Sequence, residues 1–155
     1  MNFRKRPAAI AVLAALLLVC LFLTSRGPVS FLNISNAANG SSSETTKMIQ
    51  WANDVKPVFD ELGDATETLN AGDPDKSLGQ LKTVSADLDK IICSAKDVHP
   101  TPETSVNFNK LLLDLGNYKA GVDLSIRALE EYQRGNYAVF TALKTEASNL
   151  ISRVE

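Results

Sequence analysis

The chain of 155 residues contains one histidine and two cysteines, which limits its metal and redox chemistry. A c-type haem needs the CxxCH motif and a di-iron bundle needs ExxH motifs, and the sequence contains neither. The histidine, His99, precedes a proline at the expected end of a helix, where an imidazole can cap the last carbonyls. A nucleophile also needs a neighbouring base. We therefore expect no metal, no cofactor and no enzymatic activity.

Strand patterns are almost absent, because no run of β-branched or aromatic residues alternates with polar residues over a useful length. Apolar residues instead recur every three or four positions, which is the period of amphipathic helices. Hydrophobic residues make up 45% of the sequence, and a chain of this length allows one globular domain with appendages. These features predict an all-α protein.

Acidic residues are missing from the first 43 positions, where Arg4, Lys5, Arg6 and Arg26 are the charged side chains. Of the 16 basic and 18 acidic residues of the whole chain, 12 basic and all 18 acidic residues therefore lie beyond that point, a net charge of −6. Phosphate binding depends on clustered Lys and Arg. The composition thus argues against nucleic acid as a partner of this part of the chain.

The N-terminal segment, residues 1–26, combines a basic start with an apolar run over residues 8–23 that carries no charge. We expect residues 8–25 to insert into a membrane, with the basic flank in the cytoplasm and the remainder of the chain outside. A retained single-pass anchor in the cell membrane and a cleaved signal peptide of a secreted protein both fit this pattern. Lipidation at Cys20 is disfavoured because the apolar run continues beyond it.

Residues 27–43 are rich in serine and asparagine and are predicted to be a flexible linker. Asn33 and Asn39 each begin a glycosylation acceptor triplet, which matters only in a eukaryotic secretory route. Such triplets also arise by chance in a linker of this composition. The sequence alone leaves both interpretations open.

Residues 44–155 are predicted to form an antiparallel four-helix bundle made of two helical hairpins. The first helix continues through Pro57 with a kink, because its apolar stripe keeps phase there. Glycines after the first and third helices predict tight turns of similar sequence. Three predicted helices run from about Glu44 to Ala71, from Pro74 to Val98 and from Glu103 to Arg134, and a fourth follows the turn at Gly135 and Asn136 and extends to about Val154.

The third and longest segment carries a second apolar line nearly opposite its main stripe. A helix in a simple bundle buries one face, so a second line predicts a surface for self-association or for another envelope protein. Scattered surface hydrophobes are the alternative. Cys93 could form a disulfide between two chains, or be a half-buried hydrophobe. The residues of this predicted partner surface are Val106, Leu113, Ala120 and Leu124.

Two functions are compatible with these features. The first is a membrane-anchored extracytoplasmic module that acts non-enzymatically through protein interaction. The alternative is a secreted helical bundle that binds a small ligand in a pocket lined by Trp51, Phe59, Phe108 and Tyr118, although aromatic residues at helical spacing usually fill the core. The carboxylates Asp60, Asp64 and Glu67 share one face of the first helix and could hold a divalent cation or a basic partner, although a cluster of this size is usually a solvated helix face.

Overall fold

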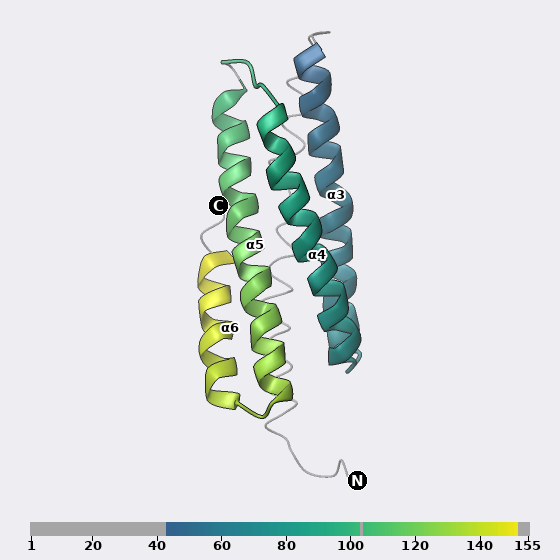
Figure 1. Ribbon diagram of the computed structural model, residues 1–155, viewed down its shortest axis with the longest axis vertical. Coiled ribbons are helices and arrows are strands. Elements are labelled where there is room, and N and C mark those ends of the chain that lie inside the picture. Colours follow the sequence, from purple (N-terminus) through teal and green to yellow (C-terminus); the bar gives the residue numbers. More distant parts are fainter. Residues whose placement is uncertain (1–42, 103, 152–155) are drawn as a thin grey trace.

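The computed structural model describes residues 43–102 and 104–151, and 89% of them are helical. This confirms the all-α class. The predicted membrane segment, residues 1–26, and most of the predicted linker lie outside the described residues. Within the described ranges, no helix is both long and apolar enough to cross a membrane. The elements are α3 (Ser43–Asn70), α4 (Pro74–Ser94), the short 3₁₀ helix η1 (Ala95–Asp97), α5 (Ser105–Gln133) and α6 (Tyr137–Ile151) (Figure 1).

The turns after α3 and α5 have the same backbone geometry, as their similar sequences predict. Gly72 and Gly135 adopt positive φ angles of 88° and 81°, which favour glycine. The residue after each glycine donates its N–H to a carbonyl five residues earlier, from Asp73 to Thr68 and from Asn136 to Glu131. This is the Schellman arrangement, and it reverses the chain within three residues.

α4 begins with a side-chain cap. The Asp73 carboxylate accepts a hydrogen bond of 3.0 Å from the backbone N–H of Lys76, and Pro74 occupies the first helical turn. At the other end, η1 tightens the last turn before Val98 becomes extended. The prolines Pro100 and Pro102 then separate α4 from α5. α5 begins at Ser105, two residues later than predicted, and ends at Gln133.

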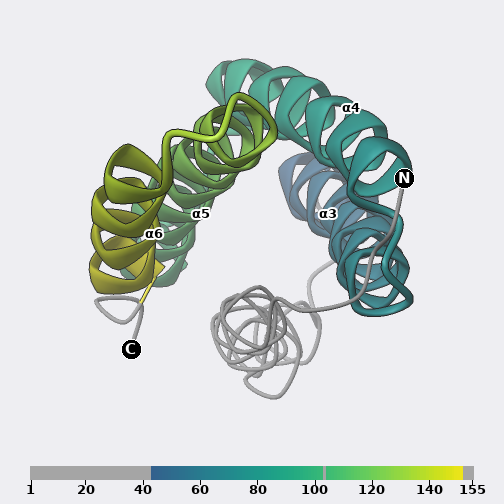
Figure 2. The same cartoon turned by 90° about the horizontal axis from the view of Figure 1, so that it is seen from below.

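The four helices alternate in direction and form an open arc (Figures 1 and 2). The closely packed pairs are α3 with α4, α4 with α5, and α5 with α6. The pair α3 and α6 is not among them, although a closed four-helix bundle would bring the first and last helices together. Among the described residues, the predicted bundle is therefore represented by two hairpins packed side by side.

The apolar stripes predicted for each helix form the core. Val55 on α3, Leu88 on α4, Leu115 on α5 and Phe140 on α6 are almost completely buried. Two polar groups of the core are satisfied by backbone carbonyls. The Trp51 indole donates to Ile91 O at 2.9 Å, and the Ser77 hydroxyl donates to Ala65 O at 2.8 Å. Both bonds join α3 to α4.

α5 and α6 approach closely at Gly121. A Cβ atom at this position would lie 2.7 Å from Cγ1 and 2.8 Å from Cδ1 of Ile151, closer than packed carbon atoms tolerate. Gly116, one turn and a half earlier on α5, has no atom within 4 Å of its would-be Cβ. Of these two α5 glycines, Gly121 is therefore the one at which a side chain would meet a packed neighbour.

This difference gives a matched pair of substitutions. Gly121→Val should lower the free energy of unfolding by about 1–3 kcal/mol, because the new side chain overlaps Ile151. Gly116→Ala should raise it by roughly 0.5–1 kcal/mol through helix propensity. Urea denaturation of both variants measures the two effects. Equal effects of the same sign would show that Gly121 is not a packing contact.

Candidate docking surface on α5

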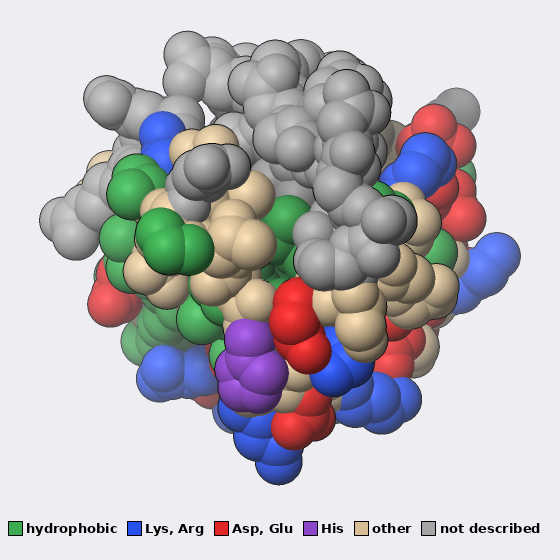
Figure 3. Space-filling view, turned by 90° about the horizontal axis from the view of Figure 1, so that it is seen from above, with side chains coloured by type: hydrophobic (Ala, Val, Ile, Leu, Met, Phe, Trp, Pro, Cys, Tyr) green, Lys and Arg blue, Asp and Glu red, His purple; other side chains and the backbone are tan. Residues whose placement is uncertain are grey.

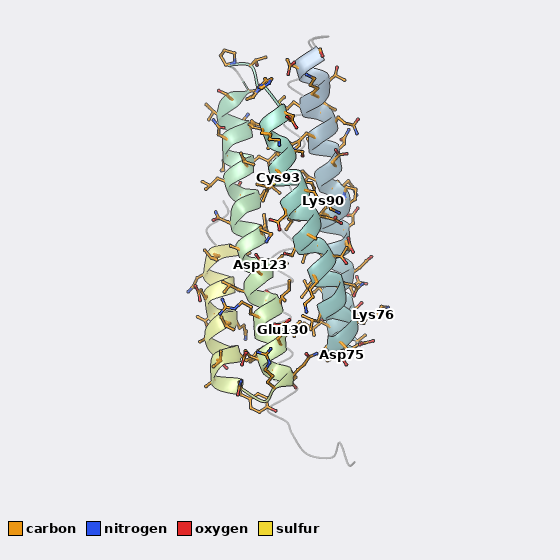
Figure 4. The ribbon with its side chains drawn as sticks, in the orientation of Figure 1. Asp75, Lys76, Lys90, Cys93, Asp123 and Glu130 are labelled. Carbon is orange, nitrogen blue, oxygen red and sulfur yellow. The ribbon has the colours of Figure 1, made fainter. Side chains whose placement is uncertain are left out.

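The side of α5 that faces α4 is joined to it by polar contacts as well as by the core. The Lys119 ammonium lies 2.6 Å from Asp123 on its own helix and 3.3 Å from Asp89 on α4. The Ser85 hydroxyl of α4 donates to the Asp123 carboxylate at 2.6 Å. Lower down, Lys82 and Glu130 form an ion pair of 2.8 Å. Asp123 and Glu130 lie along the α4 side of α5 in Figure 4.

Lys119 remains charged despite its position. Burial lowers the pKa of its ammonium group, but hydrogen bonds with Asp123 and Asp89 outweigh burial and raise the pKa above its ordinary value. The charged form is thus the one that the fold stabilises. This polar contact joins α5 to α4 beside the apolar core.

Asp123→Asn should lower the free energy of unfolding by about 1 kcal/mol, because it weakens the hydrogen bonds of Lys119 and Ser85 at a half-buried position. The control is Asp60→Asn on α3, which removes an exposed ion pair with Lys56 and should cost less than about 0.5 kcal/mol. Denaturant titrations of the two variants provide the comparison. A larger loss for the Asp60 variant would refute the structural role of Asp123.

The opposite side of α5 carries the predicted partner surface, and the structure divides it into two halves. Val106 and Leu113 are 74% and 66% exposed, Ala120 is half-buried, and Leu124 is only 8% exposed. The expectation that Leu124 belongs to an open surface is therefore wrong. The exposed α5 face is defined here as Val106, Lys110 and Leu113.

The length of α6 explains this division. α5 has 29 residues and α6 has 15, and Ile151 at the end of α6 packs against Gly121. α6 consequently covers only the second half of α5, as Figure 1 shows. The first half projects beyond it. Figure 3, viewed from that end, shows hydrophobic surface on the left, the side on which α5 lies.

Asp114 is a feature that periodicity did not identify. It follows Leu113 directly but is only 8% exposed, unlike most carboxylates. Burial raises the pKa of this carboxyl, and Lys110, one turn earlier on the helix, opposes the shift. The folded protein therefore stabilises the ionised form of the Asp114 carboxyl less than water does.

The sign of this shift predicts a pH-dependent stability difference. A carboxyl with a raised pKa in the folded state weakens folding once it is ionised, and the penalty vanishes below its unfolded pKa, ordinarily 3.8. Asp114→Asn should therefore stabilise the protein at about pH 7 but not at about pH 3. The control is Asp64→Asn on the exposed side of α3. Urea denaturation at both pH values tests this, and a stabilisation that is equal at both would refute the role of ionisation.

Cys93 lies on the outer side of α4, where its thiol is free and exposed (Figure 4). A half-buried position was the alternative expected from the sequence, whereas the structure exposes this residue. It is therefore accessible to a second thiol. Its use as a disulfide between chains remains a prediction.

The aromatic residues proposed to line a ligand pocket pack against one another in pairs. The ring centroids of Trp51 and Phe108 lie 5.0 Å apart, and those of Phe59 and Tyr118 also lie 5.0 Å apart in an edge-to-face arrangement. Each pair joins α3 to α5. Such contacts are typical of core packing.

The remaining candidate residues lie on the surface. Asp60 pairs with Lys56 at 2.6 Å, and Asp64 and Glu67 are exposed on α3. His99 is exposed in the connector between α4 and α5. Within the described ranges, no group of three or more His, Cys, Asp and Glu side chains is arranged to hold a metal ion.

Comparison with known proteins adds no relative. The chain matches no model of a known protein family, no curated protein sequence and no solved structure.

Proposed function

We propose that this chain is a membrane-anchored, non-enzymatic interaction module whose helical domain lies on the extracytoplasmic side and docks a helix through the exposed α5 face. The observation that carries the proposal is that Val106 and Leu113 are exposed in the first half of α5, whereas Leu124 on the same line is buried in the second half. Large exposed apolar side chains in line with a packed surface favour a further packed helix.

The charge around this face supports a protein partner. Lys110 is the charged residue of the exposed α5 face, whereas residues 44–155 as a whole carry a net charge of −6. An amphipathic helix with a carboxylate at its edge would complement both the apolar pair and this lysine. A nucleic acid would meet an acidic domain and be repelled.

The proposed anchor depends on the sequence of the N-terminal segment. Residues 8–25 are apolar and follow three basic residues, which favours a cytoplasmic N-terminus and an extracytoplasmic domain. The sequence offers few groups for acid–base catalysis, because its one histidine lies in the connector between α4 and α5. This supports a non-enzymatic role. The secreted form remains the competing hypothesis, because signal peptides have similar sequences.

The anchor is tested by expressing the full chain from its own start codon and measuring its intact mass in the membrane and soluble fractions. We expect a full-length mass in the membrane fraction, resistant to alkaline washing. Replacing Leu16 and Leu17 with arginine should move the chain to the soluble fraction, because charges in the apolar core oppose insertion.

Replacement of the same two leucines with valine is the matched control and should leave the chain in the membrane. A wild-type chain that lacks its N-terminal segment and is found in the soluble fraction would contradict the anchor. The secreted alternative would then hold.

A further inference from the structure

We draw no further inference here: the strongest candidate, the surface patch of Val106 and Leu113 on the half of α5 that extends beyond α6, carries none because nothing in the structure shows what covers it.

Discussion

The packing of Ile151 against Gly121 brings the last described turn of α6 close to α5. Because glycine leaves room for the Ile151 side chain, α6 lies close to α5 up to its last described turn. This contact lies in the last described turn of α6, so the coverage of α5 by described residues ends beside Gly121. One side of α5 therefore carries two surfaces of opposite character, a buried half containing Leu124 and an open half containing Leu113. The docking surface is a consequence of unequal helix lengths.

Much of the fold follows from local signals in the sequence. Asp73 and Pro74 start α4, and Gly72 and Gly135 end the helices before them, because these residues have strong intrinsic preferences at helix termini. The apolar period also predicts one buried side for each helix, and Val55, Leu88 and Leu115 are buried on these sides. The apolar stripe keeps its phase across Pro57, which predicts that the helix continues through this proline. The structure confirms this, because Pro57 lies inside α3.

The candidate docking surface was harder to predict from the sequence than the fold. Val106 and Leu124 occupy equivalent positions on a helical wheel, yet one is exposed and the other buried. Periodicity specifies the side of a helix but not the length of its neighbour, so it could not separate them. Asp114 was missed because a lone carboxylate between leucines resembles a surface residue. Its burial depends on the surrounding tertiary structure. The open arc likewise depends on which helices meet, and amphipathic patterns do not encode this.

The two Schellman turns have a consequence for the order of folding. Each joins antiparallel helices through three residues, so the helix contacts beside a turn link positions close in the sequence, whereas the bond between Trp51 and Ile91 spans 40 residues. The contacts beside each turn close the shortest loops, so the least loop entropy is lost when they form first. A chain synthesised from its N-terminus presents α3 and α4 complete before α6 exists. The contacts between α3 and α4 are therefore available first, whereas the line of α5 that contains Leu124 stays uncovered until α6 has been made.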